Sequence, residues 1–183
     1  MFTSEGYQIT ARGYDNNAGL GVPAELFFKN EPPVDGALET GLGLAGSAHH
    51  ELNPGSPDPL NFIQLDLRSI LSQDFMNGMI AVTSLQKGEK FQIFGSDVQG
   101  VLGTAISGTY GGPSFNDKFV AIPDFGSYDF ISIVAVSGNI LPSRFEADIA
   151  AVPEMSALMP IVGLLTAVAA TRILRRRRLL TSV

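Results

Sequence analysis

A stretch of seventeen residues without a charge, Met155 to Thr171, restricts what this chain can fold into more than any other feature. As an α-helix it is about 25 Å long, close to the thickness of the apolar layer of a bilayer. If the helix extends to residue 174, Arg172 can reach back to the membrane surface with its long side chain. Four consecutive arginines, Arg175 to Arg178, follow. The sequence therefore predicts one transmembrane helix over 155–174 and a basic cytoplasmic tail over 175–183.

An amphipathic or core C-terminal helix is the alternative interpretation of the uncharged run. A surface helix of that kind needs a polar face along its length. Residues 155–171 have no charge with which to form one, and Gly163 and several alanines are typical of membrane helices. A membrane span is therefore favoured, and the preceding 150 residues must fold as a separate domain.

Charge is divided unevenly between the two parts. Residues 1–152 contain seventeen acidic and seven basic residues, whereas residues 153–183 contain Glu154 and five arginines. Basic residues flanking a membrane helix stay on the cytoplasmic side, so we expect the acidic body on the opposite side. Met1 to Gly6 has neither the basic nor the apolar region of a signal peptide; we therefore expect that the true N-terminal signal is missing. The acidic body argues against nucleic acid as a partner.

The body, residues 1–150, predicts an all-β domain. Short segments with period-two alternation or continuous apolar character are separated by segments rich in Gly, Pro, Asn, Asp and Ser. The expected strands cover residues 7–11, 24–29, 61–67, 79–85, 90–94, 118–122, 130–137 and 144–149. The run over 130–137, FISIVAVS, is the most apolar and predicts a central strand. Strands of this length and spacing favour an antiparallel β-sandwich or jelly roll.

Three local features of the body give sharper expectations. Gln86-Lys87-Gly88-Glu89 predicts the turn of a hairpin between 79–85 and 90–94. Residues 69–77 form the stretch of the body most compatible with a helix. Residues 30–36, with two prolines and a glycine, predict a connecting loop.

Two groups of residues are candidates for holding a metal ion. His49-His50-Glu51 has ligands for a transition metal, but adjacent residues of an extended chain point to opposite sides, so a solvated loop is favoured. Glu39, Glu51 and Asp58 supply carboxylates for a structural calcium ion. Because no EF-hand pattern supports calcium, the expected cofactor is none, with structural calcium as the alternative.

Nucleophilic catalysis has little support in the sequence. The chain has no cysteine, which excludes disulfides, thiolate metal sites and a cysteine nucleophile. A serine triad needs His49 or His50 as its base, and no Gly-x-Ser-x-Gly elbow is present. Ser96 is more simply explained as a turn residue after a strand. We therefore expect a non-enzymatic protein.

Carbohydrate binding or hydrolysis is the alternative function for the body. Aromatic side chains stack on sugars, and paired carboxylates can hydrolyse them. Several of the aromatic candidates are expected to pack in the core or in turns. These candidates are Tyr110, Phe115, Phe125 and Tyr128.

The order of features at the C-terminus resembles a known sorting signal. Val152, Pro153 and Glu154 stand immediately before the uncharged run. Beyond the run stands the basic membrane stop, formed by Arg172, Arg175, Arg176, Arg177 and Arg178. A short Pro-Glu motif, an apolar helix and terminal arginines together resemble the PEP-CTERM signal of Gram-negative bacteria. That family has Pro-Glu-Pro before the helix, whereas Met155 takes the third position here.

The resemblance implies an exported substrate of exosortase, a membrane-embedded cysteine transpeptidase. The enzyme acts near the Pro-Glu motif, within the linker 151–154, and removes the helix. The precursor then lies in the inner membrane with its body in the periplasm, and the product reaches the cell surface or extracellular matrix. Such systems accompany exopolysaccharide and biofilm formation, so exopolysaccharide is a further expected partner. Met155 keeps a permanently anchored periplasmic protein as an alternative.

Three segments of the body also resemble the β-rich domains found upstream of this signal. They are Glu39–Leu44, Phe62–Leu67 and Phe91–Ser96. The resemblance of these segments implies a fold class and no chemistry.

Overall fold

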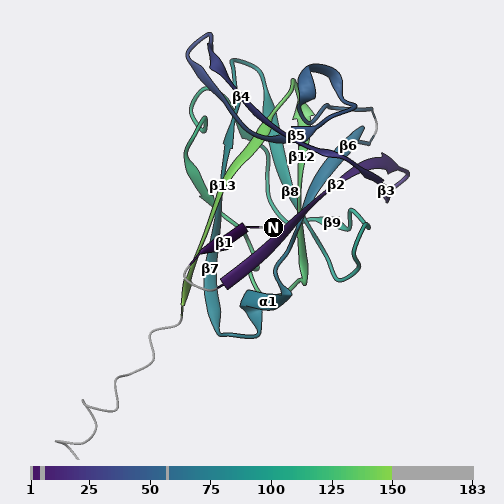
Figure 1. Ribbon diagram of the computed structural model, residues 1–183, viewed down its shortest axis with the longest axis vertical. Helices are drawn as coiled ribbons and strands as arrows, with labels where there is room; N and C mark the ends of the chain where they lie inside the picture. Colours follow the sequence, from purple (N-terminus) through teal and green to yellow (C-terminus); the bar gives the residue numbers. More distant parts are fainter. Residues whose placement is uncertain (1, 5–6, 57, 150–183) are drawn as a thin grey trace, which may run out of the picture. The chain divides into compact units, whose positions relative to one another are not determined.

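The computed structural model describes residues 2–4, 7–56 and 58–149, and they form an all-β fold of antiparallel strands (Figure 1). The expected fold class is confirmed at this level. The strands are β1 (Phe2–Ser4), β2 (Tyr7–Asn17), β3 (Leu20–Ala24), β4 (Leu26–Val34), β5 (Ala37–Leu44), β6 (Asn61–Asp66), β7 (Phe75–Thr83), β8 (Lys90–Ser96), β9 (Thr104–Ala105), β10 (Tyr110–Gly111), β11 (Phe119–Ala121), β12 (Phe130–Ser137) and β13 (Leu141–Ile149). The short helices are the 3-10 turn η1 (Ala48–His50) and α1 (Arg68–Leu71).

The largest sheet has the strand order β1-β2-β6-β12-β8-β10, with β3 also paired to β2 and β9 to β8. Strand β12 lies between β6 and β8, where Ile133 is opposite both Ile63 and Ile93. The first six residues of β12 are buried, because both faces of this strand are covered. The predicted central strand is therefore confirmed.

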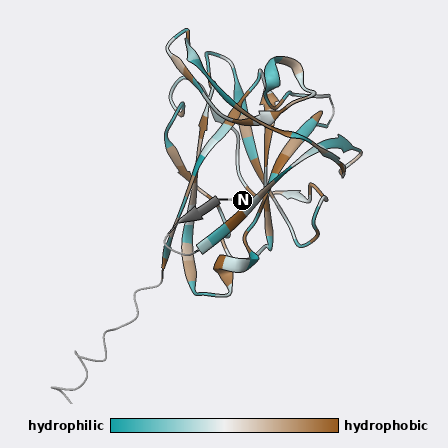
Figure 2. Ribbon diagram, in the orientation of Figure 1, coloured by the Kyte–Doolittle hydropathy of each residue, from teal (hydrophilic) through white to brown (hydrophobic). Residues whose placement is uncertain are grey.

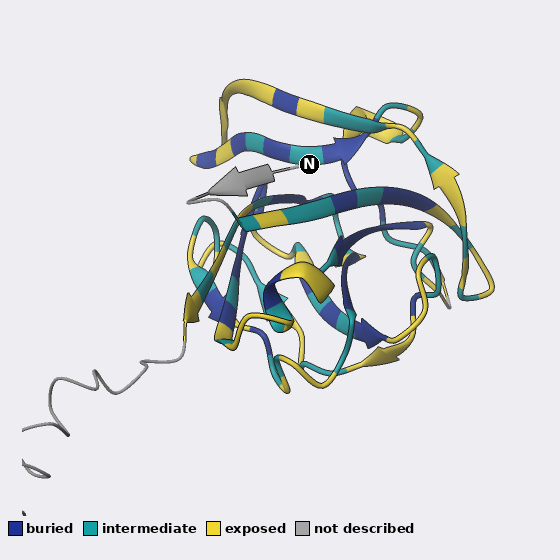
Figure 3. Cartoon of the chain, turned by 60° about the horizontal axis from the view of Figure 1, so that its bottom comes forward, coloured by how far each residue is buried: buried dark blue, intermediate teal, exposed yellow. Residues whose placement is uncertain are grey.

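Two smaller sheets complete the body. Strands β11, β7 and β13 form one, and β4 and β5 form a separate two-stranded ribbon. One hydrophobic cluster joins Ile63 and Ile93 of the large sheet to Ile80 and Val82 of β7. Apolar and polar residues alternate along many strands (Figure 2), and buried residues concentrate on the strands rather than on the connecting loops (Figure 3). The core therefore lies where the sheets face one another.

The hairpin predicted at residues 86–89 is wrong. Strand β7 pairs with β11 and β13, whereas β8 pairs with β12, so this turn carries the chain from one sheet to another. A turn motif specifies a local reversal of the chain but not which strands become hydrogen-bonded. Strand β13, whose apolar residues alternate over nine positions, takes the place beside β7 that β8 was expected to fill.

Two further expectations also need correction. The helix predicted over 69–77 covers only Arg68–Leu71, because Asp74 takes a left-handed backbone conformation (φ 58°) and β7 starts at Phe75. The loop predicted over 30–36 is mostly strand, since β4 continues to Val34. Its prolines are tolerated because the register of β4 against β5 shifts between Glu31 and Val34, where ladder hydrogen bonds are interrupted.

Strand β13 ends at Ile149, the last residue that the structure describes. The predicted linker over 151–154, the membrane helix over 155–174 and the basic tail over 175–183 lie outside the described residues. The motif Val152-Pro153-Glu154 lies there too. These features remain predictions from the sequence.

Candidate functional site

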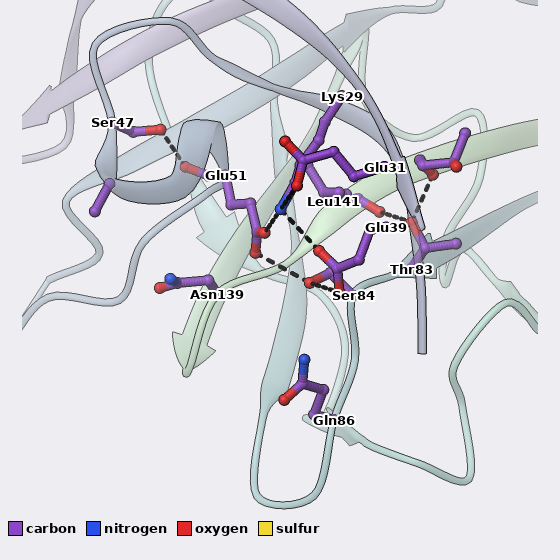
Figure 4. Close-up of polar contacts among 12 residues, drawn as sticks. Lys29, Glu31, Glu39, Ser47, Glu51, Thr83, Ser84, Gln86, Asn139 and Leu141 are labelled. Carbon is purple, nitrogen blue, oxygen red and sulfur yellow. Dashed lines mark hydrogen bonds and ion pairs between the residues drawn. The ribbon is translucent and has the colours of Figure 1, made fainter. Parts of the chain in front are cut away.

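A lysine held between two glutamates is the most unusual polar feature of the described residues (Figure 4). The Nζ of Lys29 lies 2.5 Å from Oε1 of Glu51 and 2.8 Å from Oε2 of Glu39. Exposed fractions are 6% for Lys29, 2% for Glu39 and 4% for Glu51. Side chains of these types are rarely buried to this degree unless they are paired. The carboxyl of Glu31, which is largely exposed, is a more distant neighbour at 3.5 Å.

Lys29 and Glu39 meet because the β4–β5 ribbon places them on the same face. In the antiparallel register Lys29 is opposite Gly41, and Glu39 lies two positions before Gly41 on β5. Diagonal neighbours of this kind are within reach of long side chains. Lys29 is the single buried residue of β4, whereas most residues of β5 are buried. The ribbon therefore turns this face towards the rest of the body.

Glu51 reaches the site from a loop packed directly on β5. Gly43 makes this approach possible, because a Cβ at this position would overlap the carbonyl group of His50. The loop is fixed further by Asn53, whose side chain accepts a hydrogen bond from the amide of Ala48 and donates one to its carbonyl. The amide of Asn53 in turn donates to Oδ1 of Asn61 at the start of β6. Glu51 is thus held in place by its own loop.

Ser84 closes the site from a third direction, immediately after β7. It has a left-handed backbone conformation (φ 53°), and its amide donates a hydrogen bond to the carbonyl of Leu38. Its Oγ lies 2.9 Å from Oε1 of Glu39 and 3.1 Å from Oε2 of Glu51. The hydroxyl therefore bridges the two carboxyls on the side away from the lysine. We call Lys29, Glu39, Glu51 and Ser84 the buried cluster.

The two carboxyls of the buried cluster have opposite protonation tendencies. Burial acts to raise the pKa of Glu39, but hydrogen bonds from Lys29 and Ser84 outweigh it and the pKa lies below its usual value. Burial also raises the pKa of Glu51, and there the hydrogen bond from Lys29 does not offset it. For Lys29, burial lowers the pKa, yet the hydrogen bonds to Glu39 and Glu51 prevail and raise it.

Glu51 therefore takes up a proton before Glu39 as the pH falls, and with Lys29 as an ammonium and Glu39 ionised, a protonated Glu51 leaves the cluster without net charge. This state avoids the large cost of burying an unbalanced charge. Because each member is almost inaccessible to solvent, the two carboxyls are not placed to receive a sugar chain as the acid and base of a hydrolase are.

The predicted calcium ligands are only partly brought together. Glu39 and Glu51 converge, but the Lys29 ammonium occupies the space between them, and Asp58 is an exposed residue elsewhere in the loop. No group of three or more His, Cys, Asp or Glu residues suited to a metal ion occurs in the described part of the chain. Glu39 and Glu51 do not form an open ion site because Lys29, from the neighbouring strand β4, supplies the positive charge between them.

The three residues of the predicted solvated loop, His49-His50-Glu51, differ in their exposure to solvent. Both histidines are exposed, and His50 packs its ring on Phe27 with 4.4 Å between centroids. Glu51, in contrast, is buried, so that part of the prediction is wrong. His49 and His50 both have left-handed backbone conformations (φ 59° and 57°), so the side chains do not alternate as they would in an extended chain.

Most of the aromatic candidates for sugar stacking are packed against other groups. Tyr110 lies 5.0 Å from the ring of Phe91. Phe125 and Tyr128 are partly buried against the core. Phe115 is 37% exposed and touches Tyr110 edge-on, with 5.3 Å between centroids. Ser96 ends β8 and its Oγ bonds to Val98 in the following turn, as expected.

Lys29 and Ser84 were not identified as site residues from the sequence. A signal for Lys29 is present: it follows Phe27 and Phe28 in a strand, and period two places it on the same face as Phe27. On β5, the same period aligns Glu39 with Gly41 and Gly43, which have no side chains to cover the buried face. Charged residues at inward positions beside such glycines are the pattern to look for.

An open groove of about 670 Å³ lies elsewhere on the body. Its lining is largely apolar and includes Ile9, Leu65, Ile80 and Phe145. Strand β13 contributes the continuous stretch from Pro142 to Ile149 along one side. The groove contains no counterpart of the buried cluster.

Known proteins do not assign the chain to a family. Comparisons with protein-family models, with curated proteins and with solved structures give no match. Within residues 2–4, 7–56 and 58–149, no helix has the length and apolar character needed to cross a membrane. The buried cluster and the sequence of the C-terminal tail are therefore the two features from which a function is inferred.

Proposed function

We propose that this chain is an exported, non-enzymatic protein of the cell surface or extracellular matrix, sorted by exosortase through its C-terminal tail. The observation that carries the proposal is the order Val152-Pro153-Glu154, uncharged run and arginine cluster at 172–178. A membrane span closed by arginines stays oriented with the arginines in the cytoplasm. The acidic body then faces outward, where the sorting enzyme can release it.

The fold of the body supports a structural role. Antiparallel sheets enclose a continuous apolar core, and we infer a β-sandwich of the jelly-roll kind from this packing. The carboxyls most suggestive of chemistry, Glu39 and Glu51, are buried around Lys29 rather than open to a substrate. A compact, acidic module of this kind suits a protein that persists among exopolysaccharides in a biofilm.

Sorting is tested by co-expressing exosortase with the full chain, to which a cleavable export signal has been added. We expect the mass of the product to show cleavage near Pro153-Glu154 and its location to change from the inner membrane to the surface or medium. An exosortase without its catalytic cysteine is the control. Changing Pro153 and Glu154 to alanine should block cleavage, whereas Glu146→Ala, at an exposed site on β13, should not. An intact tail under every condition, with the protein in the inner membrane, would show permanent anchoring instead.

Met155 allows a direct test of how closely the motif must match the family. Met155→Pro restores Pro-Glu-Pro, so we expect faster processing if the third residue is recognised. The processed fraction is measured over time by immunoblotting in the same co-expression system. Equal rates for both chains would show that the departure at Met155 has no effect.

Glycan binding by the body is a second candidate, favoured by Phe115. Its exposed ring, steadied by Tyr110, offers a surface for stacking on a sugar. A glycan array probed with the full chain in detergent tests this, with Phe115→Ala as the variant and Phe28→Ala, at another exposed ring, as the control. Absence of binding would leave the structural role alone.

A further inference from the structure

The buried cluster brings a primary amine and two carboxyls into contact from separate segments. Lys29 comes from β4, Glu39 from β5 and Glu51 from the loop after η1 (Figure 4). The Nζ–Oε1 distance to Glu51 is 2.5 Å. Because Cδ is one bond beyond Oε1, the amine nitrogen is near the separation of a near-attack conformer, about 3–3.5 Å. The amine is therefore close to the carboxyl carbon it would attack, and both groups have little access to solvent.

The two carboxyls of the buried cluster share one hydroxyl group as a hydrogen-bond partner. Ser84 Oγ lies within hydrogen-bonding distance of both Glu39 and Glu51, yet a hydroxyl has a single hydrogen to donate. This hydrogen is shared between the two carboxyls or donated to one of them, and protonation of the other carboxyl would supply a second hydrogen for these two contacts. Glu51 is the better candidate, because burial raises its pKa whereas the pKa of Glu39 is lowered. A protonated carboxyl, unlike a carboxylate, is an electrophile for an amine.

We propose that Lys29 and Glu51 become joined by an intramolecular amide bond, with Glu39 accepting the proton that frees the amine. The inference concerns the folded body alone and does not depend on sorting of the tail. It adds a covalent modification site to the proposed structural role. The bond would tie β4 to the loop that follows β5.

The reaction balances within the cluster. The Lys29 ammonium first gives one proton to Glu39, whose Oε2 is 2.8 Å away. The neutral amine then forms a bond from Nζ to Cδ of Glu51, and the carbon–oxygen bond to the hydroxyl group breaks. The departing hydroxyl takes one amine proton and leaves as water. The products are a secondary amide, one water molecule and a protonated Glu39, so no oxidant, reductant or activated co-reactant is needed.

The resting ammonium of Lys29 does not prevent this reaction. Transfer of its proton to Glu39 converts the ion pair into two neutral groups. The raised pKa of Lys29 and the lowered pKa of Glu39 oppose this transfer, so the neutral amine is a minor form that amide formation then removes. Fixed geometry provides the remaining advantage, since well-oriented intramolecular reactions have effective molarities of about 10⁵ M or more. Gly43 and Asn53, which hold the loop of Glu51 against β5, supply that orientation.

The intact mass of the full chain, purified in detergent, is the primary test and requires no variant. We expect a mass lower than the sequence predicts by one water molecule. Proteolysis should then yield a branched peptide in which Lys29 is joined to Glu51. An unmodified mass in the folded protein, or a link from Lys29 to a different residue, would overturn the proposal.

Variants separate the roles of the three residues. Glu51→Gln offers an amide in place of the acid, so we expect the same branched peptide with loss of ammonia rather than water. Lys29→Arg keeps a cation but lacks the amine, and should give the unmodified mass. Glu39→Gln retains both reacting groups but removes the proton acceptor, and should slow conversion about a hundredfold or more. Conversion of Glu39→Gln at the wild-type rate would refute the role of Glu39. Circular dichroism establishes that each variant is folded.

Discussion

Replacing Lys29 by methionine should make the stability of the body strongly dependent on pH. The methionine side chain has a similar length and no charge, so it fills the space while leaving Glu39 and Glu51 without a cation. Both carboxyls are almost fully buried and share Ser84 as their remaining partner. Removing one partner of a buried ion pair costs about 3–5 kcal/mol. At pH 7 we expect Lys29→Met to be less stable by an amount of this size than a variant in which the two carboxyls are also replaced by neutral groups.

The direction of the pH dependence follows from the state that the folded variant tolerates. Without Lys29, burial and mutual repulsion raise the pKa values of both carboxyls in the folded protein above the unfolded value of about 4.3. A carboxyl with a raised pKa contributes its stability below the unfolded pKa and loses it as the pH rises through the folded pKa. Lys29→Met should therefore be most stable near pH 4 and progressively less stable towards pH 8.

The reference for this measurement is the triple variant Lys29→Met/Glu39→Gln/Glu51→Gln. It lacks the amine, as the single variant does, so a cross-link cannot form in either. It also has no ionisable group at the site. Urea unfolding of the full chains in non-ionic detergent should give similar free energies at pH 4 and a difference of about 3 kcal/mol or more at pH 7. A difference that is the same at both values would refute the reasoning.

Three further predictions concern the packing and charges around the site. Gly43→Ala should destabilise the body by about 1–3 kcal/mol, because the added Cβ would displace the carbonyl of His50. The control is Gly46→Ala, whose Cβ would meet no atom within 4 Å. Equal thermal unfolding temperatures for the two variants would contradict the close packing at Gly43. Phe62→Ala should cost about 3–5 kcal/mol in chemical unfolding, because the side chain is fully buried, and a loss below 1 kcal/mol would be inconsistent with that burial. Asp66→Asn should lower the free energy of unfolding by about 1 kcal/mol at pH 7, because the hydrogen bond from the Arg68 guanidinium lowers the pKa of Asp66 in the folded protein. The stability that ionised Asp66 contributes is present above the unfolded pKa of about 3.9 and is lost as the pH falls through the folded pKa. A stability difference unchanged at pH 2 would contradict that assignment.

Strands with a strong alternating or apolar pattern were predictable. Burial of one face requires apolar residues at every second position, and burial of both faces requires a continuous apolar run. Strands β12 and β13 are the clearest cases. Strand β5 was not expected, because Gly41 and Gly43 occupy its buried face. Those glycines are present because the backbones of Pro142 and His50 lie directly against them. Where backbones are in contact, glycine replaces an apolar side chain, and the hydrophobic pattern that predicts a buried strand is absent.

The pairing of strands was less predictable than their positions. The turn at 86–89 has the composition of a hairpin, yet β7 and β8 belong to different sheets. Their partners lie far along the chain: Phe145 of β13 is 65 residues after its partner Ile80 in β7, and Ile133 of β12 is 40 residues after its partner Ile93 in β8. Their selection depends on how all apolar faces are buried together, which a local motif does not encode.

The candidate site shows the same limit for charges. The sequence predicts Glu39 and Glu51 as possible ligands of one calcium ion, and the structure does bring these two carboxyls together. The positive charge between them comes from Lys29, and a search for calcium ligands, which are oxygen atoms, does not identify a lysine. Finding it requires the register of the β4–β5 ribbon, in which Lys29 and Glu39 are diagonal neighbours.

Burying an amine and two carboxyls has a large desolvation cost, so stability alone does not account for the buried cluster. Well-packed apolar residues of similar volume often stabilise a protein as much as a buried ion pair or more. A separate chemical role explains why an amine and two carboxyls occupy this position. Disulfides are the common covalent link within domains of oxidising compartments, and this chain has no cysteine with which to form one. An amide bond between Lys29 and Glu51 would provide such a tie by condensation alone, between the edge of the β4–β5 ribbon and the loop that leads to the large sheet.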